Sequence, residues 1–344
     1  MKNDQLSPVD ITALAIAASL SLGVALPQAA SAGASHNHGG GSEDALAEGE
    51  FRALPVITLE GHGGYENNLT SEGKPAHYAI DGMFGAVMEW GLANNGKLAI
   101  EAAVGPALVW GEAEHFYGRV HVEDKHDEPS EEHHEEAGHE EHEEHSGHSD
   151  SAHATHGHEK GQPYQRIDIK GMLQARYQPN DRLTLNATWQ PHVVTRSQGD
   201  DIQGVKHEVS AGVTYALGDG DVNFALGDGL ESLIDGVFIS VSNHSGWESN
   251  GVYIGNYTDP WIGLGFNYDL LNVTLKGGPR FYTPGSYSGL SQRTDWGGEI
   301  AVEYPISESV VAFAHWEAIY STVSAEGWGK GFQNHIGTGL TFKF

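Results

Sequence analysis

The chain has 344 residues, with 18 Lys and Arg against 47 Asp and Glu, 21 His, 46 Gly and no Cys. The net charge of −29 argues against nucleic acid as a partner, because nucleic acids are bound mainly through Lys and Arg. The absence of Cys excludes disulfides, thiolate metal sites and thiol catalysis.

The first segment has the pattern of an export signal. An apolar stretch without charges runs from Ile11 to Leu26, and the small residues Ala30 and Ala32 follow it. This order predicts a signal peptide over residues 1–32. No other apolar run approaches the ~20 residues of a membrane-spanning helix, so a membrane location would require strands. We expect residues 33–50, which include three consecutive Gly, to form a flexible periplasmic lead.

From Phe51 onward, apolar and polar residues alternate in segments separated by turn residues. In the last segment, Ile336, Leu340 and Phe342 share one face, and His335 and Thr341 share the other. Alternation with a period of two places one set on each side of a β-sheet. The pattern predicts strands at 56–66, 77–90, 97–117, 163–178, 181–195, 205–217, one within 222–244, 258–268, 272–282, 295–304, 310–321 and 332–344.

Two further patterns favour a membrane barrel over a soluble sandwich. Connections alternate between short ones, such as 94–96 and 218–220, and long ones, such as 118–163. Strands that run toward the short connections end in an aromatic residue on the apolar face. These residues are Trp90, Tyr177, Tyr215, Tyr268, Tyr304 and Phe344. Short periplasmic turns, long outer loops and an aromatic girdle are typical of outer-membrane barrels.

The export signal, the alternating strands and the terminal segment 339–344 resemble Gram-negative outer-membrane β-barrels of the porin-like kind. The resemblance implies an all-β fold, a closed antiparallel transmembrane barrel over residues 51–344, located in the cell outer membrane and surrounded by its lipid. At about 20 residues per strand and connection, we predict about 12 strands. The region 222–258 leaves 10 or 14 strands open.

One segment between the third and fourth predicted strands has an extreme composition. Residues 121–160 contain 11 His and 14 Asp or Glu but only two Lys. Such a segment cannot bury a core, so we expect residues 119–160 to form a disordered extracellular loop. Imidazole beside carboxylate suits Zn²⁺ and related divalent ions. The predicted loop ligands are His121, His126, His133, His134, His139, His142, His145, His148, His153, His156 and His158.

The composition of this loop is similar to that of His-rich loops in bacterial zinc-uptake proteins. We therefore expect zinc, or another divalent transition metal, to be bound as several loosely held ions. Because an imidazole must be neutral to bind metal, capture should weaken below pH ~6.5. The alternative is a solvated acidic loop that merely repels its neighbours.

Strand alternation also places a second set of His residues on the lumen side. Strand twelve should pair with strand one in a closed barrel, so these residues would share one wall, mostly toward the extracellular half. The predicted metal-binding wall comprises His62, His77, His115, His315, His335, Glu60 and Glu317. The alternative is ordinary polar lining, and a shift of one residue in strand phase would turn any of them outward.

The leading functional prediction is a non-enzymatic barrel that captures zinc at the cell surface and passes or holds it in a polar lumen. A periplasmic metal-binding partner would then have to take the ion onward. A general porin with an incidental metal-buffering loop is one alternative, and an adhesin or metal sensor with a sealed lumen is another. A lipid-modifying enzyme is disfavoured. Ser240, Ser242 and His244 share the lumen face, and no acidic partner lies at a matching spacing in the sequence.

Overall fold

The computed structural model describes residues 46–66, 76–111, 165–195, 203–224, 232–285, 292–322 and 330–344. The predicted signal peptide, the first part of the predicted lead and the His/acid-rich segment lie outside these ranges. Among the described residues, no helix has the length and apolar character that crossing a membrane would require.

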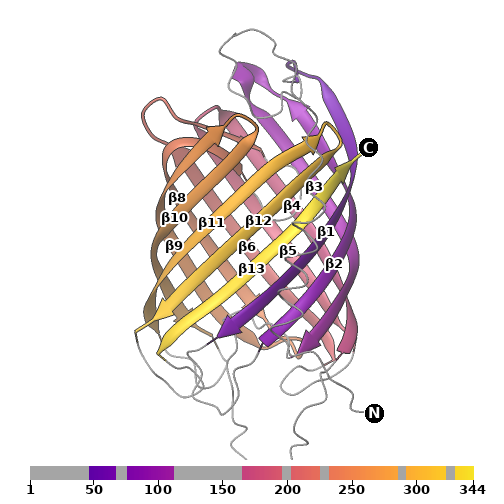
Figure 1. Ribbon diagram of the computed structural model, residues 1–344, viewed down its shortest axis with the longest axis vertical. Coiled ribbons are helices and arrows are strands. Elements are labelled where there is room, and N and C mark those ends of the chain that lie inside the picture. The colour runs from indigo at the N-terminus through magenta and orange to yellow at the C-terminus, as the bar shows by residue number, and fades with distance from the viewer. Residues whose placement is uncertain are drawn as a thin grey trace, which may run out of the picture. The chain divides into compact units, whose positions relative to one another are not determined.

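Twelve strands form a closed antiparallel barrel (Figure 1). Each pairs with its neighbour in the chain, β6 pairs with β8, and β13 closes the ring against β1. A thirteenth strand, β7, is short and lies outside this ring of pairings. The strands are β1 (Phe51–Glu66), β2 (Ala76–Gly91), β3 (Lys97–Gly111), β4 (Gln165–Asn180), β5 (Leu183–Val194), β6 (Gly204–Ala216), β7 (Asp221–Phe224), β8 (Ser232–Trp247), β9 (Tyr253–Tyr268), β10 (Leu271–Pro284), β11 (Arg293–Ser307), β12 (Val310–Ser321) and β13 (Gly331–Lys343). A 3₁₀ turn, η1 (Ala93–Asn95), connects β2 to β3.

The two faces of the barrel strands have opposite chemistry. Ile80, Phe84 and Ile262 are each more than half exposed on the outside, whereas Asp81 and Glu101 are buried on the inside. Large exposed apolar side chains are unfavourable in water and favourable in hydrocarbon, and a closed ring leaves no unpaired strand edge. The barrel is therefore built to span a membrane, and the prediction of an all-β closed antiparallel barrel of about 12 strands is confirmed.

The predicted aromatic girdle also lies on the outer surface. Five of its six members are exposed, and Trp90 packs against the exposed Phe51 with ring centroids 5.1 Å apart. The exposed five are Tyr177, Tyr215, Tyr268, Tyr304 and Phe344. Aromatic rings at this level suit a membrane interface, where one side of the ring contacts hydrocarbon and the polar atom contacts water.

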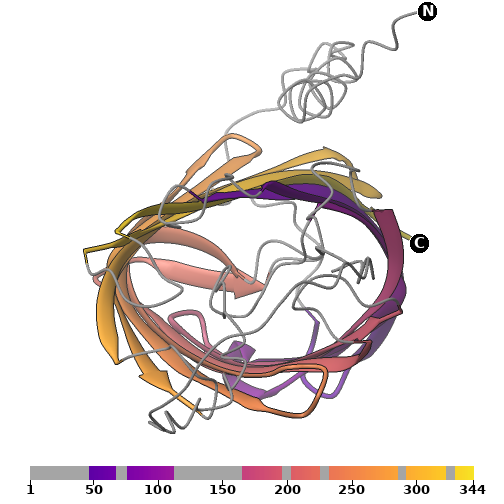
Figure 2. The same ribbon diagram turned by 90° about the horizontal axis from the view of Figure 1, so that it is seen from below.

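One predicted connection is wrong. The sequence predicts that residues 218–220 are a tight turn between two barrel strands. Instead, this turn leads into β7, which pairs with the first residues of β8 in the register Asp221↔Asp235 to Phe224↔Ser232. Seen along the barrel, β7 lies in the interior (Figure 2). The predicted seventh strand within 222–244 is therefore two elements, β7 and β8.

The β7–β8 segment is held by side chains from well-separated strands. The Gln178 side chain on β4 donates to the Val222 carbonyl at 2.6 Å, and the Asn272 side chain on β10 donates to the Ile234 carbonyl at 3.4 Å. Val222 and Ile234 are buried with Ala216 and Phe238. Because four barrel strands separate β4 from β10, this segment crosses part of the lumen at the end that has the short connections.

Candidate functional site

Three His side chains and a carboxylate gather inside the barrel where its last strands meet its first. They are His315 on β12, His335 on β13, and His62 and Glu60 on β1. Gly337 is the register partner of both His62 and His315, which places these strands side by side. The alternation of faces along each strand turns all four side chains to the lumen. We call these four residues the histidine cluster.

The members of the histidine cluster are in van der Waals or polar contact. The rings of His62 and His335 have centroids 5.1 Å apart, and those of His335 and His315 are 5.4 Å apart and nearly parallel. His315 Nε2 lies 3.7 Å from Glu60 Oε1. A Cβ atom added at Gly337 would lie 2.4 Å from both Glu60 and His315, so only glycine leaves room for this arrangement.

A cation lies next to the histidine cluster. Lys170 on β4 places Nζ 3.2 Å from His62 Nε2 and 2.5 Å from Asp81 Oδ2. Asp81 Oδ2 also lies 3.2 Å from His62 Nε2. The Lys170 ammonium and the Asp81 carboxylate are therefore both in contact with Nε2 of His62.

The cluster is not arranged as a finished metal site. Within the described ranges, no group of three or more His, Asp or Glu side chains converges closely enough to hold an ion. Zinc ligands lie only about 2.0–2.2 Å from the metal for nitrogen and oxygen. Binding would require the rings to rotate toward a common point and Lys170 to withdraw from His62.

The structure brings together only some of the predicted wall. His62, His315, His335 and Glu60 are adjacent, as described above. Glu317 is the register partner of His335, and it also accepts a hydrogen bond from Arg280 at 2.9 Å. The backbone of His77 pairs with Gly64 and Gly111, and its side chain lies outside the described part of the structure. His115 and the eleven predicted loop ligands, His121 to His158, also lie outside the described residues.

Several other lumen charges are paired across strands. Arg280 Nε and Nη2 contact both oxygens of Asp259 at 2.6–3.1 Å, and the guanidinium lies 4.2 Å from the centre of the Tyr257 ring. Lys276 pairs with Glu299 at 2.9 Å. These residues line a cavity of about 300 Å³ whose wall extends from β3 round to β12.

The fold, its apolar outer surface and its polar interior define the class of protein: an outer-membrane β-barrel. Residues 224–344 match the family model described as cyanophage outer membrane protein like beta barrel domain. No curated protein matches the chain.

Several solved barrels are similar in fold at low identity. The translocator domain of the autotransporter NalP from Neisseria meningitidis has 10% identity and a TM-score of 0.44, covering 88% of this chain and 91% of that one. An outer membrane channel from Pseudomonas putida F1 has 10% identity and a TM-score of 0.44, covering 89% and 99%. An anion-selective porin from Comamonas acidovorans has 9% identity and a TM-score of 0.33, covering 86% and 100%.

Proposed function

We propose that this barrel binds divalent transition-metal ions, zinc foremost, at the histidine cluster and at the His/acid-rich segment 119–160. The observation that supports the lumen part of the proposal is the meeting of three imidazoles and a carboxylate on β12, β13 and β1. Neutral imidazole and carboxylate are the ligands that Zn²⁺ takes in the absence of thiolates.

The histidine cluster lies near one end of the barrel. His77 pairs with both Gly64 and Gly111, so β1 ends, β2 begins and β3 ends at this end. His62 lies two residues before Gly64 on β1, which places it close to this mouth of the lumen.

Metal binding at the histidine cluster does not require the backbone of the barrel to change. In the proposed site the strands stay paired, the side chains rotate to bring the imidazole nitrogens together, and Lys170 withdraws from His62. Lys170 repels a cation while it stays beside His62. The lumen site should therefore bind a single ion with modest affinity, while the segment binds several ions weakly.

The test is calorimetric titration of the refolded barrel with zinc, alongside a variant that lacks residues 121–160. We expect the full chain to bind several ions and the shortened chain to bind one. Combining the deletion with His62→Ala and His335→Ala should remove this last site. His192→Ala, a lumen imidazole that contacts Asp168 at 3.0 Å, is the matched control and should leave it intact.

Other results would select a different function. A shortened chain that binds no zinc would reduce the protein to a porin with a metal-buffering loop. Zinc binding that survives loss of both His62 and His335 would show that the histidine cluster is polar lining. No binding by the full chain would leave a general porin.

A further inference from the structure

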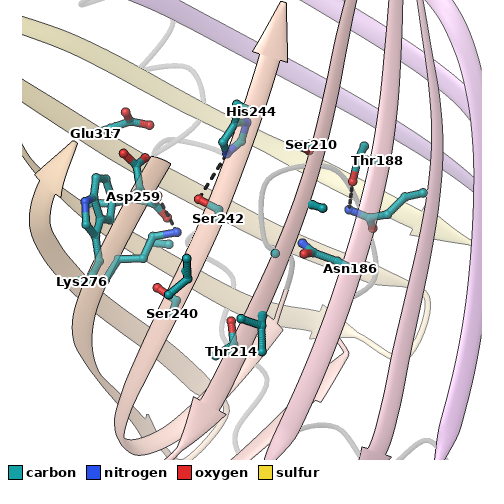
Figure 3. Close-up of a pocket in the computed structure, with 18 of the residues that line it drawn as sticks. Asn186, Thr188, Ser210, Thr214, Ser240, Ser242, His244, Asp259, Lys276 and Glu317 are labelled. Carbon is teal, nitrogen blue, oxygen red and sulfur yellow. Dashed lines mark hydrogen bonds and ion pairs between the residues drawn. The ribbon is translucent and has the colours of Figure 1, made fainter. Parts of the chain in front are cut away.

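A serine, a histidine and a glutamate on β6 and β8 meet in the lumen, and the metal proposal does not use them. His244 Nδ1 lies 2.8 Å from Glu208 Oε1, and His244 Nε2 lies 3.3 Å from Ser242 Oγ. Figure 3 shows the Ser242–His244 contact on one strand, with both side chains turned into the cavity. Each nitrogen of the imidazole thus has a different partner.

These contacts determine the tautomer of His244. A carboxylate can only accept a hydrogen bond, so Glu208 fixes the proton on Nδ1. Nε2 then has a free lone pair and accepts the hydroxyl proton of Ser242. A serine nucleophile requires this arrangement: a base beside the hydroxyl and a carboxylate that orients the base.

Strand geometry keeps the three groups in place. Ser242 and His244 are two residues apart and so share the inner face of β8. On β6, Ser210 is opposite His244, and Glu208 is opposite Gly246, which makes Glu208 the diagonal neighbour of His244. Tyr257 on β9 is directly opposite His244 and stacks on it with ring centroids 4.5 Å apart and planes 13° apart. The imidazole is therefore restrained from both sides.

The site is open to a small molecule. Ser242, His244 and Glu208 line the cavity of about 300 Å³, which is at the lower end of ligand-pocket sizes. The side chains of His244 and Glu208 are 20% and 30% exposed, so lumen water reaches them. Phe238 and Trp261 add apolar surface to the same cavity, which suits a short acyl chain.

A hydrogen-bond donor for a developing oxyanion would have to come from a side chain, because the backbone at Ser242 is paired in the ladders to β6 and β9. The side-chain donor that we assign to this role is Nδ2 of Asn186 on β5. The register partner of Asn186, Gly212, is opposite Ser242, and a Cβ atom at Gly212 would lie 2.3 Å from the acceptor Oδ1 and 3.5 Å from the donor Nδ2. The glycine thus lets an amide from the next strand approach the cavity beside the serine.

We propose that Ser242, His244 and Glu208 form a hydrolytic site for small, water-soluble carboxylic esters. Ser242 Oγ attacks the carbonyl carbon as its proton passes to His244 Nε2. Collapse of the tetrahedral intermediate breaks the bond to the alcohol, which leaves with that proton. Water then attacks the acyl-serine ester, gives its proton to Nε2 and releases the acid, while Ser242 recovers its proton. Glu208 stays ionised and acts as a positioning residue.

The test uses the purified full chain in detergent, a small fluorophosphonate that reacts with activated serines, and p-nitrophenyl butyrate. We expect the probe to be found on Ser242 by peptide mass spectrometry. Ser242→Ala and His244→Asn should each lower ester turnover by about a hundredfold or more. Glu208→Gln should lower kcat with KM unchanged, which mere damage to the cavity would not produce. Asn186→Ala should slow turnover without preventing folding.

Ser240→Ala is the matched control, because Ser240 shares the strand and face of Ser242 but has no place in the proposed chemistry. It should hydrolyse the ester and react with the probe as the parent chain does. Comparison with Ser242→Ala also subtracts hydrolysis by the many other His residues. The proposal is overturned if a folded barrel, judged by its β-sheet circular dichroism, is not labelled at Ser242. It is equally overturned if Ser242→Ala hydrolyses the ester at the parent rate.

Discussion

Among single residues, Lys170 opposes metal binding at the histidine cluster most directly. Its ammonium lies 3.2 Å from His62 Nε2. It also donates a hydrogen bond to the Asp81 carboxylate, which could otherwise serve as a metal ligand. Two unit charges 4 Å apart interact by about 4 kcal/mol at an effective dielectric constant of ~20. We therefore predict that Lys170→Met raises the zinc affinity of the lumen site by at least about tenfold, or ~1.4 kcal/mol.

Calorimetry on the chain without residues 121–160 measures this change without interference from the loop ligands. Lys276→Met is the matched control, because Lys276 pairs with Glu299 elsewhere in the lumen. It should leave the zinc affinity unchanged. An unaltered affinity in Lys170→Met would mean that the ion binds away from His62.

Arg280 is the residue on which the charge balance of the cavity depends. It contacts the carboxylates of Asp259 and Glu317 and covers the face of Tyr257. Removal of one partner of a buried pair is costly because the remaining charge is left without compensation. We predict that Arg280→Met lowers the free energy of unfolding by about 3 kcal/mol or more, measured by denaturant unfolding from lipid vesicles.

Two further variants separate this effect from simple loss of a side chain. Arg280→Met combined with Asp259→Asn should recover part of the lost stability, since one of the stranded charges is gone. Arg52→Met removes a partly exposed Arg that pairs with Glu89 and should cost less. Equal losses in all three variants would contradict the interpretation.

Among the elements, β7 and the start of β8 lie across part of the lumen. Leu217 donates to the carbonyl of Val237, so the chain between them leaves the barrel wall and returns at almost the same point. We predict that replacing residues 218–236 with Asn-Gly, a two-residue hairpin turn, raises single-channel conductance several-fold in planar bilayers. The reason is that the replaced segment crosses the lumen between Gln178 and Asn272.

The control replaces Glu308 and Ser309, the connection between β11 and β12, with the same Asn-Gly turn. This change shortens nothing inside the barrel and should leave the conductance as it was. If the variant without residues 218–236 conducts no better than the control, the segment does not limit passage through the barrel.

The element scale also explains which part of the fold the sequence predicts. The period of two assigns an inner and an outer side to every strand without knowledge of its neighbours. It therefore places Glu60, His62 and Glu317 in the lumen, where the structure also has them. The position of β7 and of the start of β8 inside the barrel depends instead on contacts with Gln178 and Asn272, which are distant in the sequence. A short segment such as Val222 to Phe224 has no local pattern that distinguishes an interior strand from a barrel strand.

At the scale of the whole molecule, the register between strands decides which side chains meet, and the sequence reports it only in part. The contact between His62 and His335 requires only that the last strand pairs with the first, and the structure confirms this pairing. The contact of Glu208 with His244 depends on how β6 pairs with β8, and the inserted β7 separates these strands in the chain. No spacing in the sequence reports that register, so the sequence alone predicts no acidic partner for Ser242 and His244.

The charge of the whole barrel leads to a prediction about ion selectivity. Among the buried charged side chains of the described residues, nine are acidic and five are basic, and the full chain has a net charge of −29. A polar lumen with excess carboxylate raises the local concentration of cations. We predict that the opened variant without residues 218–236 prefers K⁺ over Cl⁻, as the reversal potential in a KCl gradient will report. The preference should fall as salt rises and screens the charges.

Deleting residues 121–160 should reduce the preference for K⁺ without reversing its sign, because the lumen carboxylates remain. A reversal potential that favours Cl⁻ would mean that the paired Arg and Lys residues, rather than the acidic excess, determine the field along the conducting path.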